Sequence, residues 1–359
     1  MKKKILHIAE AFSTGIYTYL RDLTSYMTNV LGEENYEIVI VYSKRDVLDE
    51  SKIKDDFSDK VKFVKIQMTR NINPKNDFGS LQALRKILKA ERPDIVHLHS
   101  SKAGVLGRIA CSGIIKRDKV FYSPHGYAFL RQDISPMTQK AFRQIEKSVQ
   151  FFFGGITIAS GETELEFAKK IGKTFFVRNG IDFKNQKFTQ ASQENQKFTV
   201  GTIGVLHAQK NPMGFNEIAL KMPEVHFVWI GNGELADQVT APNVTITGWV
   251  ATREELLSRA SAFDVYLQVS LWEGLSIAIL EAMALGKPIV ASNIVGNKDS
   301  VKDGETGFLI NTTDEAVSAI KKLQDESLRK VMGKASYQRC KDLFDKDKNF
   351  EELIKIYES

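Results

Sequence analysis

The sequence predicts an α/β protein made of two Rossmann-like, doubly wound domains that face each other across a cleft. The first observation is a regular alternation of short apolar, β-branched runs with longer amphipathic segments, which is typical of a parallel sheet covered on both faces. The second is length, because 359 residues exceed what most single hydrophobic cores accommodate. The third is a linker-like stretch at 184–197, rich in Gln, Asn, Lys and Ser. We therefore expect an N-terminal domain at 1–184 and a C-terminal domain at 197–340.

The first alternating series supplies the elements of the N-terminal domain. Strands are expected where β-branched and aromatic residues form short runs, and helices where longer segments show helical periodicity. A loop with Gly15 follows the first strand, and Arg92-Pro93 ends the second helix because the residue before a proline avoids the helical region. The expected strands cover residues 5–9, 37–42, 61–66, 94–99, 119–123, 156–159 and 175–177, and the expected helices cover about 16–31, 81–90, 137–153 and 162–171.

The second series starts with a strand at 198–203 and has the same rhythm. A helix is expected at 275–285, because an unbroken apolar run ends there at Gly286 and Pro288, two helix stop signals. The segment 314–357 is expected to form two or three helices. The remaining expected elements are strands at 225–230, 244–246, 264–269, 289–291 and 307–310 and a helix at 254–261. Ligands of such paired domains bind beyond the carboxyl ends of the strands.

Charge is distributed unevenly along the chain, which has a formal net charge of +6. Residues 1–190 contain 32 Lys and Arg against 21 Asp and Glu, whereas residues 191–359 contain 18 against 23. A basic first half predicts contact with something anionic, such as a membrane surface or a lipid-diphosphate acceptor. Nucleic acid fits less well, because the sequence shows no basic–aromatic stripe and no nucleic-acid-binding motif.

The cysteines and the N-terminal residues indicate the cellular compartment in which the protein is expected. Cys111 and Cys340 lie far apart in the sequence, which fits neither a disulfide framework nor a zinc site and favours a reducing cytoplasm. Three lysines and a short apolar run near the N-terminus superficially resemble a signal peptide, but His7 and Glu10 interrupt the run. No segment approaches the ~20 apolar residues of a membrane span. We expect a cytoplasmic protein, with contact to the inner face of the cell membrane as an option.

One stretch places two glutamates on a strand–turn–helix unit. Glu273 lies in the turn after a buried strand, and Glu281 lies about two turns into the following helix. The amides of Gly274, Leu275 and Ser276 precede that helix, at the positive end of its dipole. Two carboxylates and a row of amides can bind the sugar hydroxyls, the diphosphate and the ribose of one sugar nucleotide. A capping interaction with a solvated face fits the same spacing, and the spacing alone favours it.

The same stretch resembles a known family motif. It reads Ser-x-x-Glu-Gly-Leu in the turn and Glu-Ala-Met-Ala-x-Gly-Lys-Pro from the helix onward, so that Glu273 and Glu281 form a Glu-x7-Glu pair. This pattern is similar to that of retaining glycosyltransferases of family GT4, which have the GT-B fold. The resemblance covers nearly the whole chain and is most specific from about 198 to 310. It implies that a C-terminal helix at 341–359 crosses back to the N-terminal domain.

The resemblance implies a role for each candidate site residue. Glu273 would bind sugar hydroxyls near the reacting carbon, Glu281 would hold the ribose, and Lys210 would contact the donor phosphates. His125 follows a strand in Ser-Pro-His-Gly and is similar to a family histidine that contacts the donor hexose near that carbon. Val250 would meet the nucleotide base. His125, Glu273 and Lys210 are therefore the expected catalytic residues.

Two positions depart from the family pattern. Family members carry two glycines in the loop after the first strand, where this chain has Thr14-Gly15. Gly15 is expected to let a donor approach the backbone, although an ordinary turn glycine also fits. Val205 stands where the family has a phosphate-binding arginine, which removes a planar bidentate donor. Lys210 still offers a point charge, and His207 is a candidate substitute.

His97 and His99 alternate along one expected strand, which places both side chains on the same face. A metal pair is conceivable, but the sequence shows no third ligand. We therefore expect a structural role for both histidines, close to the ligand.

The resemblance implies retaining transfer of a hexose from a nucleoside-diphosphate sugar, with uridine favoured by analogy, to a hydroxyl of a saccharide or lipid-linked acceptor in bacterial surface-polysaccharide synthesis. No cofactor and no metal are expected, because Asp345-Lys346-Asp347 is in the C-terminal tail rather than in a catalytic loop. Two alternatives remain open. A sugar-nucleotide epimerase of the same fold would convert the donor without an acceptor. A catalytically weak nucleotide-binding partner subunit is motivated by Val205 and would bind the donor without turnover.

Overall fold

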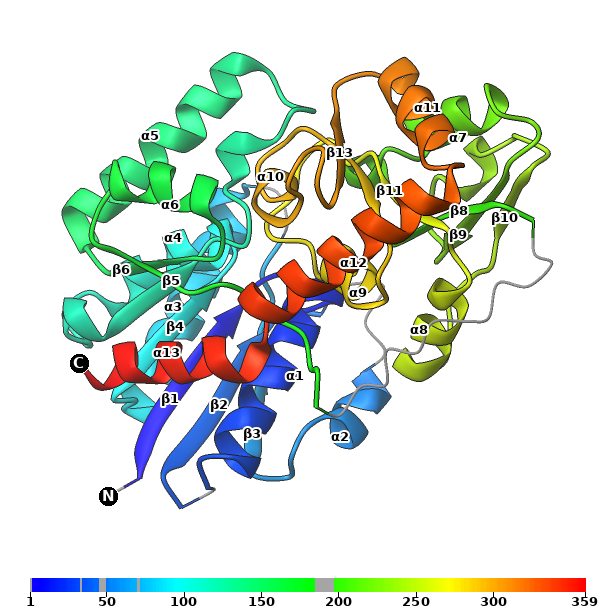
Figure 1. Ribbon diagram of the computed structural model, residues 1–359. Coiled ribbons are helices and arrows are strands. Elements are labelled where there is room, and N and C mark those ends of the chain that lie inside the picture. The colour runs from blue at the N-terminus through cyan, green and yellow to red at the C-terminus, as the bar shows by residue number, and fades with distance from the viewer. Residues whose placement is uncertain (1, 33, 45–49, 70–71, 185–196) are drawn as a thin grey trace. The chain divides into compact units, whose positions relative to one another are not determined.

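The computed structural model describes residues 2–32, 34–44, 50–69, 72–184 and 197–359. Within these residues the chain forms two compact units: unit 1 comprises residues 1–130, 134–178 and 347–359, and unit 2 comprises residues 131–133 and 179–346. Each unit contains one parallel sheet covered by helices, as Figure 1 shows. The prediction of two Rossmann-like domains is confirmed.

Unit 1 is built on a seven-stranded sheet in the order β3-β2-β1-β4-β5-β6-β7, in which every pair is parallel. The order reverses between β1 and β4, and this topological switch point is where such sheets bind ligands beyond the carboxyl ends of the strands. The strands are β1 (Lys3–Ala9), β2 (Tyr36–Tyr42), β3 (Val61–Lys65), β4 (Ile95–His99), β5 (Val120–Ser123), β6 (Ile156–Ala159) and β7 (Thr174–Phe176).

Helices cover both faces of this sheet because alternate strand residues are buried on opposite sides. Ile5 of β1 packs in a core with α1, α2 and α13, whereas Leu6 packs in a second core with α3, α4 and α6. The helices are α1 (Thr14–Asn29), α2 (Ile53–Asp56), α3 (Pro74–Glu91), α4 (Ser101–Cys111), α5 (Pro136–Phe153), α6 (Glu162–Lys169) and α13 (Lys346–Glu358).

Helix α4 is an element that the sequence pattern does not predict, since Gly104 and Gly107 both weigh against a helix. The structure explains both glycines. A Cβ on Gly104 would lie 2.3 Å from the Tyr122 ring, and a Cβ on Gly107 would lie 2.4 Å from the Leu98 side chain. Glycine at both positions therefore lets α4 pack directly against the sheet.

Unit 2 has a six-stranded parallel sheet in the order β10-β9-β8-β11-β12-β13, with its switch point between β8 and β11. Its strands are β8 (Thr199–Ile203), β9 (His226–Ile230), β10 (Val244–Ile246), β11 (Val265–Gln268), β12 (Ile289–Ser292) and β13 (Gly307–Ile310). Its helices are α7 (Pro212–Leu220), α8 (Arg253–Ser261), α9 (Ile277–Ala284), α10 (Asn297–Ser300), α11 (Thr313–Lys322) and α12 (Glu326–Leu343). Helices α7 and α11 pack in one core of the unit, and α8 and α9 pack in the other.

The boundaries of the units differ by a few residues from the expected ones. Residues 179–184 belong to unit 2, because Ile181 is fully buried in its core and its N–H donates to the carbonyl of Phe344 at 2.9 Å. The expected linker at 184–197 lies outside the described residues, apart from its two ends.

The expected crossing segment at 341–359 belongs to unit 1 only from residue 347 onward, because α12 continues to Leu343 and Cys340 is buried in unit 2. From there α13 packs in the core of unit 1, where the Phe350 ring centroid lies 5.6 Å from that of Tyr19 in α1. Among the described residues, no helix combines the length and the apolar character needed to cross a membrane.

Candidate functional site

Glu273 lies in the loop between β11 and α9 and is 8% exposed. Two residues that follow β8 bind its carboxylate: Lys210 Nζ lies 2.6 Å from Oε1, and Gln209 Nε2 donates to Oε2 at 3.2 Å. Because β8 and β11 are neighbours at the switch point, the loops after their carboxyl ends meet there. The structure therefore brings together Lys210 and Glu273, which the sequence singled out in separate motifs.

Gln209 joins these two loops into one rigid unit. Its side chain also donates to the carbonyl of Trp272 at 3.0 Å, and its own carbonyl accepts from Leu271 N–H at 2.8 Å. Sequence reasoning passed over Gln209, because a polar loop residue next to a lysine carries no distinguishing pattern. These bonds hold Lys210 and Glu273 in place before any ligand arrives.

Glu281 lies in α9 and is 6% exposed. Its Oε1 lies 2.7 Å from Nη2 of Arg253, the first residue of α8. A nearly buried guanidinium therefore faces the carboxylate that the sequence singled out. Thr252 and Glu255 mark the start of α8 in the sequence as a cap, but a cap does not reveal the partner of Arg253.

The backbone between the two glutamates belongs to the turn before α9. The side chain of Leu275 is buried in the core of unit 2, and Ser276 Oγ donates to Gln268 Oε1 at 3.2 Å. Both side chains are therefore directed into the protein, and the backbone of Gly274, Leu275 and Ser276 directly precedes the first helical residue. Binding of a donor by their N–H groups stays a prediction.

The backbone of Gly296 packs against this turn. It has φ +86°, and a Cβ built on it would lie 1.8 Å from the carbonyl oxygen of Gly274. The two backbones therefore approach each other more closely than any side chain would allow, and this contact fixes the position of the turn.

The other predicted donor residues of unit 2 lie at the same edge of the sheet. Val205 follows β8 and is half-buried, and Gly204 before it accepts a hydrogen bond from Trp229 Nε1 at 2.8 Å. Val250 follows β10 and packs against the core that contains α8 and α9. His207 precedes the helical turn at Ala208–Lys210. Lys210 is thus the cation of the loop after β8, and Val205 adds none.

Gly15 does not lie in a loop as expected, because α1 already begins at Thr14. A Cβ on Gly15 would meet no heavy atom of the described chain within 4 Å. No neighbouring group of the described residues therefore requires glycine here. Its role toward a donor stays a prediction.

His125 follows β5 and has φ +51°, a left-handed conformation that is uncommon for residues other than glycine. The next N–H, at Gly126, donates to Glu164 Oε1 at 3.0 Å and holds the loop. Loss of hydration lowers the pKa of His125 to about 4. Its Nε2 lies 3.0 Å from His99 Nδ1, so the predicted catalytic histidine is continuous with the histidines of β4.

His97 and His99 point to the face of the sheet covered by α1 and α13, as the alternation predicts, and His7 of β1 is the third imidazole beside them. Nitrogen atoms of the three rings lie within 4.8 Å of one another. However, His97 Nδ1 lies 2.5 Å from Tyr357 Oη and its Nε2 lies 2.8 Å from Ser123 Oγ. A metal ion bound to either nitrogen would have to displace the hydroxyl that this nitrogen contacts, so the structural role expected for His97 fits better. Sequence reasoning did not include His7, although its position in the first strand was the available signal.

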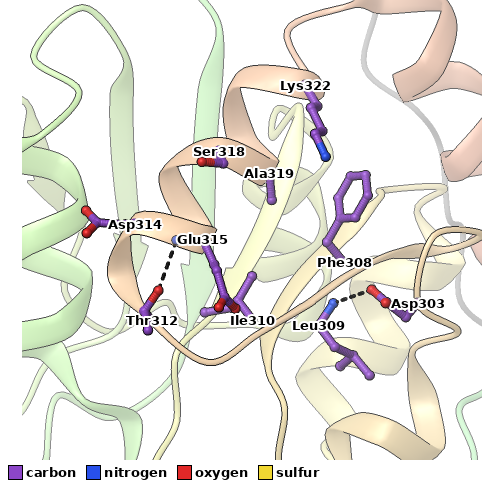
Figure 2. A pocket seen from close by; sticks show the side chains of 10 residues that line it. All are labelled: Asp303, Phe308, Leu309, Ile310, Thr312, Asp314, Glu315, Ser318, Ala319 and Lys322. Carbon is purple, nitrogen blue, oxygen red and sulfur yellow. Dashed lines mark hydrogen bonds between the residues drawn. The ribbon is translucent and has the colours of Figure 1, made fainter.

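A separate pocket of about 360 Å³ lies between β13 and α11 of unit 2. Figure 2 shows that Phe308, Glu315 and Lys322 face it, and the Lys322 ammonium lies 5.5 Å from the centroid of the Phe308 ring. None of the predicted site residues lines this pocket. The candidate site is therefore defined by the side chains around the β8 and β11 loops and not by this cavity.

Comparison with known proteins decides the family. Residues 4–151 match a family model described as "Glycosyl transferase 4-like", and residues 197–326 match one described as "Glycosyl transferases group 1". The chain is 30% identical over 328 residues, 81% of each chain, to UDP-Gal:alpha-D-GlcNAc-diphosphoundecaprenol alpha-1,3-galactosyltransferase of Escherichia coli. The chain belongs to glycosyltransferase family GT4. This GT4 protein is also 28% identical over 328 residues to the capsular polysaccharide biosynthesis glycosyltransferase CapM of Staphylococcus aureus, with 81% of this chain and 83% of CapM covered.

Solved structures agree on the fold of this GT4 glycosyltransferase. Sucrose-phosphate synthase from Thermosynechococcus elongatus superposes with a TM-score of 0.81 at 18% identity, covering 99% of this chain and 98% of the other. Anabaena HepE in complex with UDP and glucose gives a TM-score of 0.77 at 18% identity, covering 98% of each chain. The GT-B fold that the resemblance implied is therefore confirmed.

Proposed function

We propose that this GT4 glycosyltransferase moves a hexose from a nucleoside-diphosphate sugar, with UDP as the nucleotide, to a hydroxyl of a lipid-linked saccharide and retains the anomeric configuration. The observation that carries the proposal is the arrangement in unit 2, where Lys210 pairs with Glu273 in the loop before α9 and Glu281 lies in α9 itself, paired with Arg253. The names of the relatives support the details: the E. coli enzyme uses UDP-Gal and a diphosphoundecaprenol acceptor, and HepE was solved with UDP-glucose.

Each part of this arrangement suits one part of the donor. The N–H groups before α9 and the ammonium of Lys210 suit the diphosphate, since the N–H groups carry a partial positive charge and the ammonium a full one. Glu281 suits the two ribose hydroxyls, because an ionised carboxylate accepts two hydrogen bonds, and Arg253 holds it in place. Glu273 suits the hydroxyls of the hexose. Val250 would contact the base.

The chemistry requires the bond between C1 of the sugar and the phosphate oxygen to break while the acceptor oxygen bonds to C1. Negative charge develops on the departing diphosphate, and Lys210 together with the turn amides would stabilise it. Retention without a covalent intermediate is explained by attack on the same face, with the departing phosphate taking the proton of the acceptor hydroxyl. His125 would orient the hexose.

An acceptor held at a membrane is supported by the surface of α5. Met137, Phe151 and Phe152 are 81%, 79% and 62% exposed, and Lys140 and Lys147 of the same helix are also exposed. Apolar and basic side chains on one helix suit an anionic lipid surface. This proposal places the protein at the cytoplasmic face of a membrane in surface-polysaccharide synthesis.

Calorimetry with UDP, GDP, ADP and dTDP tests the donor site directly. We expect one nucleotide, UDP, to bind the wild type, and Glu281→Gln to weaken that binding about 10- to 100-fold, because a charge-assisted hydrogen bond to the ribose is lost. Gln keeps the shape of the side chain, and a thermal melt of each variant checks folding. Glu217→Gln is the matched control, since Glu217 is an exposed carboxylate of the same unit.

Two results would contradict this assignment. Equal binding of UDP to Glu281→Gln and wild type would remove Glu281 from the site. Absence of binding for all four nucleotides would remove the proposed donor site from unit 2. Binding of UDP without transfer to the true acceptor would favour the partner-subunit alternative, for which Val205 in place of a phosphate-binding arginine is the specific observation.

We also propose that transfer needs no metal ion, because Lys210 and the α9 amides already supply positive charge for the diphosphate. The Asp345–Asp347 segment supports this, since it lies at the start of α13 and its central Lys346 is paired with Asp182 at 2.8 Å. We expect transfer of labelled hexose to a lipid-linked acceptor to proceed at full rate in excess EDTA. A loss of rate that Mg²⁺ or Mn²⁺ restores would overturn the proposal.

A further inference from the structure

Three histidines of unit 1 form a continuous line from the loop after β5 into the core. His125 Nε2 lies 3.0 Å from His99 Nδ1, and His99 Nε2 lies 3.0 Å from His7 Nδ1. His125 is partly exposed, whereas His99 and His7 are 0% exposed. The line therefore begins at the predicted catalytic histidine and ends in the interior, at the switch point between β1 and β4.

Burial favours the neutral form of all three imidazoles. Burial lowers the pKa of His7 to about 3 and that of His125 to about 4, and it holds the pKa of His99 well below its usual value. A neutral imidazole has one N–H donor and one acceptor nitrogen. Each nitrogen–nitrogen contact needs one of each, so the tautomer of any member determines the tautomers of the other two.

Only two arrangements satisfy both contacts. In the first, every ring carries its hydrogen on Nδ1: His7 donates to His99, His99 donates to His125, and His125 keeps an Nδ1–H that the line does not use. In the second, every ring carries its hydrogen on Nε2, and His125 is left with a bare Nδ1 acceptor.

The inner end of the line decides between the two arrangements. His7 Nε2 is buried and has no hydrogen-bond partner among the described residues. In the first arrangement this atom is a bare acceptor, and in the second it is an N–H donor. A buried N–H without a partner is the rarer and less favourable state. The environment of His7 therefore favours Nδ1–H on all three rings.

We propose that His7 and His99 are positioning residues that hold His125 in its Nδ1–H tautomer, so that His125 presents a hydrogen-bond donor to an oxygen of the substrate. The contact between His125 and a sugar rests on the proposed function. The tautomer of His125 does not depend on that function. The left-handed backbone of His125 and the bond from Gly126 N–H to Glu164 fix the ring against this line. Tyr19 closes the other side, with its ring edge-on to His125 at a centroid distance of 5.1 Å.

His97 provides a matched control. It lies on the same strand and face as His99, is equally buried, and its ring centroid is 4.2 Å from that of His99. Its two nitrogens, however, contact the hydroxyls of Tyr357 and Ser123, which can donate or accept, so it takes no part in the line.

The test is a two-bond ¹H–¹⁵N correlation spectrum of the full chain labelled with ¹⁵N-histidine, recorded without any nucleotide. The chain has only six histidines, so single substitutions assign the signals. We expect His125, His99 and His7 each to show the Nδ1–H pattern in the wild type. We expect His99→Phe to turn the His125 signal into a mixture of both tautomers, and His97→Phe to leave it unchanged.

The wild-type spectrum alone can overturn the proposal: an Nε2–H pattern on His125 contradicts it even if His99→Phe does not fold. A His125 tautomer that is unchanged in folded His99→Phe, or altered as strongly in His97→Phe, also contradicts it.

In the transfer assay we expect His99→Phe to lower kcat/KM about tenfold, as for one lost hydrogen bond in the transition state. Because the spectrum needs no substrate, failure of the proposed transferase activity would leave the tautomer result standing.

Discussion

Replacing Lys210 with Met is expected to lower kcat/KM for hexose transfer about 10²- to 10³-fold, the usual cost of removing one preorganised charge at a transition state. Lys210 is the cation of the loop after β8, where Val205 contributes none. Its Nζ is held 2.6 Å from Glu273, and Gln209 fixes the loop that carries both. The turn amides of α9 would then face the developing charge of the diphosphate without a cation.

Lys221→Met is the matched control for this change. Lys221 is more exposed, lies in the same unit and pairs with Glu217 and Asp314 at 2.8 and 2.7 Å. Removing such a surface pair has little effect, so we expect activity within about twofold of the wild type. If Lys210→Met keeps more than about a tenth of the activity, another group stabilises the negative charge of the diphosphate, and His207 becomes the residue to substitute next.

Breaking the buried pair between Arg108 and Glu146 is expected to lower the free energy of unfolding of unit 1 by about 3–5 kcal/mol. Arg108 Nη2 lies 2.5 Å from Glu146 Oε2, and the two side chains are 1% and 5% exposed. Tyr122 Oη donates to the other carboxylate oxygen at 2.9 Å, and Arg108 Nε donates to the carbonyl of Gly104 at 2.7 Å. Arg108→Met would leave the Glu146 carboxylate buried without its cation.

Urea unfolding of three variants measures this effect. Arg117→Met is the control, because Arg117 is exposed and donates only to the carbonyl of Phe152 among the described residues, so its cost should stay within about 0.5 kcal/mol. The double variant Arg108→Met/Glu146→Leu should recover much of the loss, because it leaves no buried unpaired charge. A cost below about 1 kcal/mol for Arg108→Met, or a double variant less stable than the single, would contradict this account of the pair.

Most strands could be predicted because parallel strands buried on both faces form short apolar runs that turns and helices interrupt. The expected strand at 264–269 appears as β11 and the expected helix at 275–285 as α9, each within two residues at its ends. Helix α4 could not be predicted, because its glycines serve contacts with Tyr122 and Leu98 that only the folded sheet creates.

The candidate site likewise contains some residues that could be predicted from the sequence and others that could not. Lys210, Glu273 and Glu281 could be singled out from the sequence because each lies in a short motif that resembles a GT4 motif. Arg253 was not, because it reaches Glu281 from the start of another helix. His7 lies far from His99 in the sequence and meets it only because β1 and β4 are neighbours. Partners that depend on strand order leave no local signal.

The place of α13 in unit 1 bears on how the ribosome produces this chain. Phe350, Leu353 and Tyr357 of α13 fill the same core as α1, on the face of the sheet that carries His7. Translation therefore delivers nearly all of unit 1 early, but its apolar face stays uncovered while the whole of unit 2 is synthesised. N-terminal domains usually fold first on the ribosome. Here the domain that starts first is the last to be completed, because its core includes residues 350–357.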